Sequence, residues 1–150
     1  MRNRTLWVIT LTMAGVLECT MALAHFGLQY EWSGFDFGAL PAQLAWALLA
    51  LNFSWGVLLL AIGCLVVYAG QSGNATGVFT RKFVFIVGLF WLIHGMYVWA
   101  VPMPLPPRLL WLKYVLGAFP APLIALHWVP LVATRTVAAV HRPASVPRTH

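Results

Sequence analysis

Four long apolar runs dominate the pattern of hydrophobic and polar positions along the chain. They cover about residues 6–28, 42–69, 83–101 and 109–133. Each is long enough to cross about 30 Å of hydrocarbon as a helix, at about 1.5 Å per residue. A backbone in lipid must satisfy its own hydrogen bonds, and the alternation typical of membrane barrel strands is absent from the sequence. The pattern therefore predicts an all-α integral membrane protein, a four-transmembrane-helix up-down bundle.

The segments between the runs are rich in residues that break helices. Gly70, Gly73 and Gly77 separate the second run from the third, and four prolines between positions 102 and 107 separate the third from the fourth. Residues 135–150 are basic and contain two prolines. We therefore expect a transmembrane domain at residues 1–134, followed by a flexible cytoplasmic tail at residues 135–150.

Composition and charge refine this picture. The chain is 61% hydrophobic and only 8% charged, which excludes a soluble globular domain and a disordered chain. Seven of the nine Lys and Arg residues fall on one side of a four-span protein: Arg2, Arg4, Arg81, Lys82, Arg135, Arg142 and Arg148. The positive-inside rule predicts that this side is cytoplasmic, with both termini, in a multi-pass protein of the cell inner membrane. Topology accounts for the basic charge, so no nucleic acid partner is expected.

The N-terminus permits one alternative interpretation. A basic start, an apolar stretch and the sequence Ala22-Leu23-Ala24 together resemble a secretory signal with a cleavage site. Against cleavage, Glu18 is an unusual residue so near such a site, and the apolar run continues to Leu28. We favour an uncleaved first span.

Several polar residues interrupt the apolar runs, and such residues inside a membrane are costly and usually functional. Counted at about 1.5 Å per residue from the outer end of each run, Glu18 lies about 14 Å deep, His94 about 10 Å and Lys113 about 7 Å. Asn52 is similarly deep, and His25 and Gln43 lie near the outer boundary. We predict an intramembrane polar site in the outer half of the bundle, formed by Glu18, His25, Asn52, His94 and Lys113.

Glu18 should face the interior of the bundle, because lipid offers no partner for a carboxylate. The expected partner is His94 or Lys113, since an adjacent cation stabilises the charged carboxylate. His127 falls in the inner half of the fourth run by the same depth estimate and is placed apart from the site. The two cysteines, Cys19 and Cys64, are about 18 Å apart along the membrane normal by that estimate, too far to bridge.

The chemistry of the site is left open among three kinds of ligand. His25 and His94 are candidate axial ligands for haem, because neutral imidazole is a common axial ligand. Glu18, His25 and His94 together are a candidate transition-metal site, since carboxylate and imidazole suit iron, copper or zinc. A quinone or a lipid lying between the spans is the third alternative. No sequence motif of a soluble-type enzyme is present.

Small residues and prolines predict how the spans pack. Gly56 and Gly63 in the second run, and Gly88 and Gly95 in the third, are each seven residues apart. Such stripes let helices approach closely, so we expect the second and third spans to touch along them. Three prolines should kink the fourth span: Pro120, Pro122 and Pro130.

Three classes of function fit these features. The first is an accessory or assembly subunit of a larger membrane complex, which the small size and the lack of an extramembrane domain permit; its partners would be other membrane protein subunits. The second is a membrane redox protein that binds haem, a metal or a quinone. The third is a small proton-coupled transporter that uses Glu18. The sequence favours the first and does not decide whether the protein is an enzyme.

Overall fold

The computed structural model describes residues 2–33, 41–72, 77–101 and 110–140, and over these residues it is entirely helical. The helices are α1 (Arg2–Ser33), α2 (Ala42–Gln71), α3 (Val78–Ala100), α4 (Leu110–Ala118) and α5 (Pro120–Val140). Four stretches are long and apolar enough to cross a membrane: Arg4–Leu28, Ala42–Gln71, Val78–Ala100 and Lys113–Thr134. The predicted class, a helical protein with four candidate spans, is confirmed.

The helices are longer than the apolar runs that predicted them. Helix α1 continues to Ser33 instead of stopping near Leu28, α3 begins at Val78 instead of near Phe83, and α5 reaches Val140. Charged and polar residues end an apolar run, but Arg and Lys are good helix formers and need not end a helix. The first six residues of the expected tail therefore belong to α5, and residues 141–150 lie outside the described residues.

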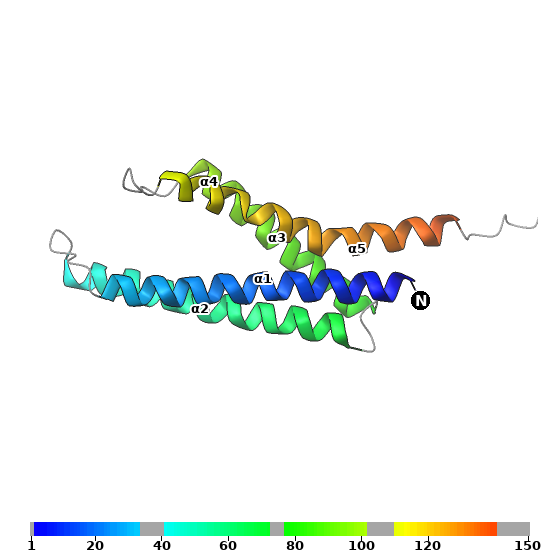
Figure 1. Cartoon of the computed structure of the whole chain (residues 1–150), viewed down its shortest axis with the longest axis horizontal. Helices are drawn as coiled ribbons and strands as arrows, with labels where there is room; N and C mark the ends of the chain where they lie inside the picture. The colour runs from blue at the N-terminus through cyan, green and yellow to red at the C-terminus, as the bar shows by residue number, and fades with distance from the viewer. Residues whose placement is uncertain (1, 34–40, 73–76, 102–109, 141–150) are drawn as a thin grey trace, which may run out of the picture.

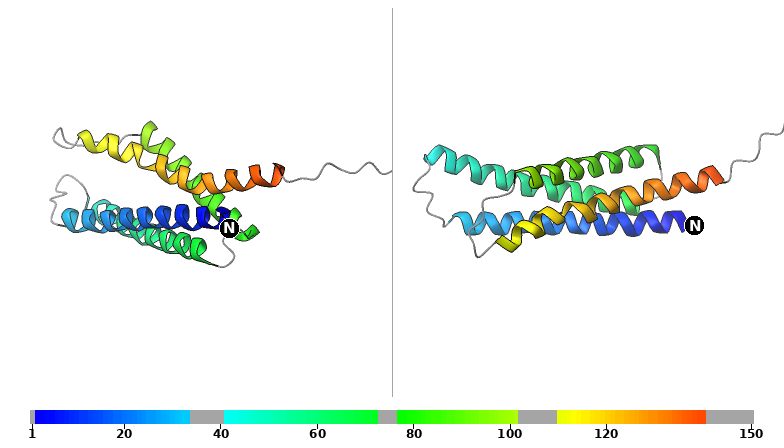
Figure 2. Two further views of the ribbon diagram at one scale, coloured as in Figure 1. Left: turned by 45° about the vertical axis from the view of Figure 1, so that its right-hand side comes forward. Right: turned by 90° about the horizontal axis from the view of Figure 1, so that it is seen from above.

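Helices α1 and α2 lie side by side along most of their length (Figures 1 and 2), and their contact is the most extensive in the molecule. Glycines on α2 bring the two backbones together. An added Cβ at Gly63 would lie 2.8 Å from the carbonyl oxygen of Gly15, and one at Gly70 would lie 2.9 Å from Cβ of Leu11. These positions are seven residues apart, which places them on one face of α2.

The second pair of helices is α3 with α5, and it also packs on glycines. An added Cβ at Gly88 would meet the indole of Trp128, and one at Gly95 would lie 3.0 Å from Cβ of Pro120. The prediction that the second and third spans touch along these glycines is therefore wrong. Its glycines are used for close packing, but Gly56 and Gly63 face α1 while Gly88 and Gly95 face α5.

The fourth span is divided into α4 and α5 at Phe119, where the prediction placed a kink. Pro120 and Pro122 have no amide hydrogen, so the helical bonds they would donate are missing and the backbone turns. The carbonyl of Gly117, just before the break, accepts a hydrogen bond of 2.9 Å from Nε1 of Trp99 on α3. Pro130 lies inside α5, which continues past it.

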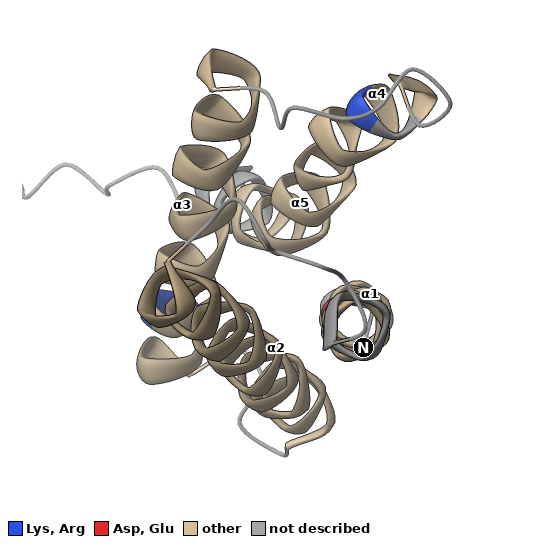
Figure 3. Cartoon of the chain, turned by 90° about the vertical axis from the view of Figure 1, so that its left-hand side faces the viewer, with Lys and Arg blue, Asp and Glu red and all other residues tan. Residues whose placement is uncertain are grey.

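The two pairs meet mainly through α1 and α5. The ring of Trp55 on α2 also contacts the rings of Phe90 and His94 on α3. The largest fully buried apolar side chains include Trp7, Leu11, Leu59, Trp91 and Leu123, so all three long helices and α5 contribute to one core. Most other large apolar side chains are exposed, as expected where lipid rather than water surrounds the protein. In Figure 3 few of the described residues on the helices are charged.

Candidate functional site

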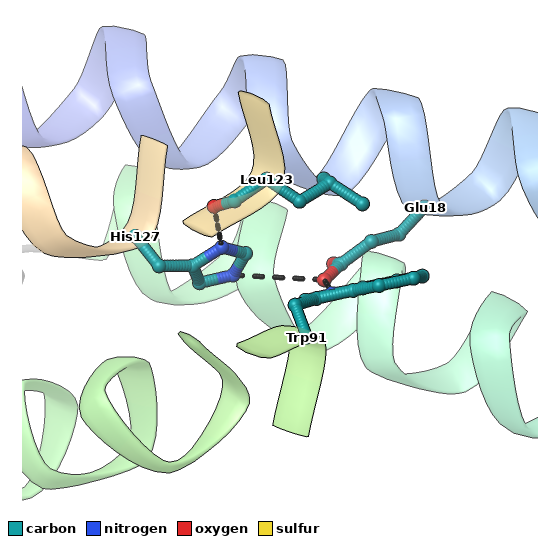
Figure 4. Close-up of polar contacts among 4 residues, drawn as sticks. All are labelled: Glu18, Trp91, Leu123 and His127. Atoms are coloured by element: carbon teal, nitrogen blue, oxygen red, sulfur yellow. Dashed lines mark hydrogen bonds and ion pairs between the residues drawn. The ribbon is translucent and has the colours of Figure 1, made fainter. Parts of the chain in front are cut away.

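Glu18 of α1 lies at the centre of the molecule with none of its surface exposed. Its Oε1 accepts a hydrogen bond of 2.7 Å from Nε1 of Trp91 on α3. The same oxygen lies 3.6 Å from Nε2 of His127 on α5, and His127 is also fully buried. Figure 4 shows the carboxylate between the indole and the imidazole. One carboxylate thus joins three helices.

The contacts of His127 determine which of its nitrogens carries a proton. Its Nδ1 lies 2.7 Å from the carbonyl oxygen of Leu123, and a carbonyl can only accept (Figure 4). Nδ1 is therefore protonated, and Nε2 faces Glu18. At 3.6 Å, Nε2 is beyond hydrogen-bond distance of Oε1. Two forms keep the pair neutral: a protonated Glu18 beside a bare Nε2, and a protonated Nε2 beside an ionised Glu18. The pair then has no net charge in either form, which minimises the cost of burial in a low dielectric.

Glu18 faces the interior, as expected, but its ionisable partner is His127 rather than His94 or Lys113. The prediction measured depth from the ends of the apolar runs, and the first run ended too early. Counted from Ser33, where α1 ends, Glu18 lies about 22 Å along its helix. Counted from Leu110, where α4 begins, His127 lies about 25 Å along α4 and α5. The two residues are therefore at similar depth.

His25 of α1 is held by Asn52 of α2 in a two-point contact. Nδ1 of His25 lies 2.7 Å from Oδ1 of Asn52, and Nδ2 of Asn52 donates a hydrogen bond of 2.9 Å to the backbone oxygen of His25. The second bond fixes the orientation of the amide, so Oδ1 accepts and Nδ1 of His25 carries the proton. The neutral imidazole then offers Nε2 as a hydrogen-bond acceptor. This contact joins two of the predicted site residues.

His94 of α3 sits in a cluster of aromatic rings. Its ring centroid lies 5.8 Å from that of Trp55, 6.1 Å from that of Phe90 and 5.6 Å from that of Trp91. The Phe90 ring is nearly parallel to the imidazole, at 14°, whereas the Trp91 ring is nearly perpendicular, at 87°. Such packing holds the imidazole in one orientation.

His25 and His94 both line a cavity of about 350 Å³ between the helices. Trp91 forms part of the same wall, and its indole also binds Glu18, so it connects the cavity to the buried pair. The remaining lining is aromatic or aliphatic: Met21, Trp55, Leu59, Tyr97, Val98, Val101, Leu116, Phe119 and Pro120. The cavity is thus mostly apolar, with a few polar groups that can orient a ligand.

The remaining predicted site residue, Lys113 of α4, is exposed. Gln43 of α2, which was expected near the outer boundary, is exposed as well. The proposed metal ligands Glu18, His25 and His94 do not form a metal site, since no three His, Cys, Asp or Glu side chains among the described residues could hold a metal ion together. The structure instead divides them: Glu18 belongs to the buried pair, and the two imidazoles belong to the cavity.

The depth estimate was also wrong for the cysteines. Cys19 of α1 and Cys64 of α2 are close enough for their side chains to interact, and both thiols are free. The register of α1 against α2 explains this, because Gly15 and Cys19 lie directly against Gly63. Extending α1 beyond Leu28 shifts that register from the one the apolar runs suggested.

Trp91 and His127 were not among the predicted site residues, although the position of each within its span indicates a buried polar contact. Tryptophan is enriched at membrane interfaces, where its N–H meets water. Trp91 lies in the middle of the span Val78–Ala100, so its N–H needs a partner from the protein. His127 lies well inside the span Lys113–Thr134, which makes it as costly to bury as His94.

Comparison with protein-family models, with curated proteins and with solved structures finds no match for this chain. The assignment of a function therefore depends on the geometry of the buried pair and the cavity.

Proposed function

We propose that this chain is a membrane protein that binds a small ring-bearing molecule of the quinone class in the cavity lined by His25 and His94. The proposal rests on the residues that line this cavity. Two imidazoles from different helices line one cavity of about 350 Å³ whose other walls are aromatic or aliphatic. Ligand sites typically enclose about 300–1,000 Å³ and combine apolar walls with a few polar groups. A quinone head group matches this, with a flat ring and polar oxygens.

The polar groups of the cavity supply complementary hydrogen bonds. In the neutral imidazole of His25, Nε2 is an acceptor, because Oδ1 of Asn52 accepts the proton of Nδ1. A neutral imidazole at His94 has one N–H donor, and the hydroxyl of Tyr97 can donate as well. The cavity can therefore bind a carbonyl oxygen at one side and a hydroxyl group at the other. Trp55, Trp91 and Phe119 offer ring faces against which a planar ligand can stack.

The membrane topology is part of the same proposal. We expect α1, α2, α3 and the α4–α5 unit to cross a cell inner membrane in alternate directions, with both termini cytoplasmic. The uneven distribution of Lys and Arg along the sequence supports this orientation. The cavity would then open toward the outer half of the bilayer, where a lipid-soluble ligand can enter from the hydrocarbon.

Binding can be measured with a short-chain ubiquinone analogue added to the purified protein in detergent, by quenching of tryptophan fluorescence. Because Trp55 and Trp91 line the cavity, a bound quinone should quench them. His25→Phe and His94→Phe keep a ring but remove the polar nitrogens. Each should raise Kd about tenfold, since losing one hydrogen bond to a buried partner costs about 1–3 kcal/mol.

Thr20→Val is the matched control. Thr20 lies on α1 like His25, but it is exposed and bonds only to the carbonyl of Val16 on its own helix. Its removal should leave Kd unchanged. Quenching that is absent, or equal in His25→Phe and Thr20→Val, would contradict a quinone site. A Soret band in the purified protein that is lost in His25→Phe would favour haem instead.

A proton-coupled transporter using Glu18 is the second candidate, and the buried Glu18–His127 pair favours it. The pair can hold one proton in the middle of the molecule without net charge. Glu18→Gln would remove this proton exchange but keep an oxygen to accept the bond from Trp91. In proteoliposomes with a pH-sensitive dye, substrate-driven proton movement that Glu18→Gln abolishes would support transport.

An accessory role in a larger membrane complex stays a prediction from the small size of the chain. Affinity purification of the full chain from its native membrane is the direct measurement. Stoichiometric recovery of other membrane subunits would support the accessory role, whereas recovery of the chain alone with a bound quinone would support the ligand site.

A further inference from the structure

A second cavity lies on α3, at its start, away from the site of Glu18 and His94. It has a volume of about 540 Å³ and is lined by Val78, Arg81, Lys82, Phe85 and Ile86 of α3 and by Leu131 of α5. The α3 residues follow one another at intervals of three and one, which places them along one side of the helix. Beyond the apolar Val78 at the start of α3, the cavity has a cationic end at Arg81 and Lys82 and an apolar end at Phe85 and Ile86.

The two cations have no carboxylate to pair with in the described part of the chain. The sequence contains three acidic residues, and Glu18 is occupied by Trp91 and His127. The others, Glu31 and Asp36, come at or after the end of α1. Figure 1 shows that this end of α1 lies at the opposite end of the molecule from the start of α3. No carboxylate side chain among the residues whose side chains the structure describes therefore pairs with the positive charge at the cavity.

The apolar end of the cavity is shaped by contact between α3 and α5. The ring of Phe85 stacks on the indole of Trp128 on α5, with centroids 6.1 Å apart and planes at 13°. Trp128 is itself packed against Gly88, one turn farther along α3. Ile86 stays 62% exposed beside this stack. The apolar wall is thus open to the surrounding hydrocarbon on one side.

We propose that this cavity binds an anionic phospholipid. The phosphate oxygens would lie between the guanidinium of Arg81 and the ammonium of Lys82, and one acyl chain would follow Phe85, Ile86 and Leu131. Arg and Lys are the side chains that bind phosphate most strongly, and basic pockets between transmembrane helices bind anionic head groups. A free anion would use the cationic end but gain nothing from the apolar end, which is why a lipid fits better.

The test uses the full chain in detergent, with added phosphatidylglycerol, phosphatidylcholine or inorganic phosphate, and measures thermal unfolding. Phosphatidylglycerol should raise the midpoint, and the other two should not. Arg81→Gln combined with Lys82→Gln should raise the concentration of phosphatidylglycerol needed by on the order of tenfold or more. Lys113→Gln removes an exposed cation elsewhere and should change nothing.

A second pair of variants separates a built site from simple charge attraction. Ile86→Trp keeps both cations but fills the apolar end of the cavity, so it should weaken the response to phosphatidylglycerol severalfold. Ile93→Trp makes the same change at a position two turns along α3 that is 60% exposed and does not line the cavity, so the response should be unaffected. Equal responses in the two tryptophan variants, or stabilisation of the wild type by phosphatidylcholine or inorganic phosphate, would overturn the proposal.

Discussion

The contact between α1 and α2 predicts that Gly63→Ala destabilises the protein although it adds only one methyl group. The new Cβ would lie 2.8 Å from the backbone oxygen of Gly15, 3.0 Å from the backbone nitrogen of Cys19 and 2.7 Å from its sulfur. Two of these three neighbours are backbone atoms and cannot rotate away. The helices must therefore separate by a fraction of an ångström along their most extensive contact.

The expected magnitude follows from two opposing effects. Overpacking in a well-packed interior costs about 1–3 kcal/mol. Replacing glycine by alanine inside a helix contributes about 0.5–1 kcal/mol in the other direction, because the unfolded glycine is more flexible. Gly63→Ala should therefore lower the free energy of unfolding by about 0–2.5 kcal/mol, and by about 1–3 kcal/mol relative to an unhindered change from glycine to alanine. Gly27→Ala on α1 is the control, since no heavy atom lies within 4 Å of its added Cβ, and it should be neutral or slightly stabilising.

Unfolding of each variant by sodium dodecyl sulfate in mixed micelles, followed by circular dichroism or tryptophan fluorescence, gives the difference directly. Adding Cys19→Ala to Gly63→Ala removes the sulfur contact but not the backbone contacts, so only part of the loss should be recovered. If Gly63→Ala is as stable as Gly27→Ala, α1 and α2 do not approach as closely as the structure has them. Full recovery by Cys19→Ala would assign the whole clash to the thiol.

Three further outcomes are expected. Gly88→Ala should be destabilising, and Trp128→Leu should partly reverse it, because the three heavy atoms nearest to the new Cβ all belong to that indole; unfolding of the two single variants and the double variant measures the coupling. Asn52→Leu should cost about 1 kcal/mol, since it removes two hydrogen bonds to His25 at about 0.6 kcal/mol each in a membrane. Ser72→Cys should react with a membrane-impermeant maleimide only in inverted vesicles; labelling in intact cells would reverse the proposed topology.

The apolar runs predicted the number and kind of helices because a chain that crosses hydrocarbon must satisfy its own backbone hydrogen bonds along the whole span. They could not predict where each helix ends. Polar residues such as Glu31 end an apolar run without ending α1, which continues to Ser33. Since depth was counted from the end of the run, an error of five residues displaced Glu18 by about 7 Å. That displacement was enough to exclude His127 as its partner.

The sequence could not predict which helices pack against each other, for a different reason. Glycines seven residues apart show that one face of a helix lacks side chains. Any neighbouring helix can approach such a face closely, so the spacing does not identify the partner. Gly56 and Gly88 seemed matched because they were estimated to lie at similar depth. In the structure their partners are Phe26 of α1 and Trp128 of α5. What decides the pairing is the fit of particular large side chains against each glycine, which spacing alone does not contain.

The burial of Glu18, in contrast, followed from the cost of exposing a carboxylate to lipid, and its location has a consequence for the whole bundle. Glycine contacts hold α1 to α2 and α3 to α5, but they do not join the two pairs. Glu18 does, since it belongs to α1 and contacts Trp91 on α3 and His127 on α5. The cavity also lies between the two helix pairs, with His25 of α1 on one side and His94 of α3 on the other. A ligand between the two imidazoles would therefore hold together the helix pairs that the carboxylate joins, so ligand binding and the state of the buried pair should influence each other through Trp91.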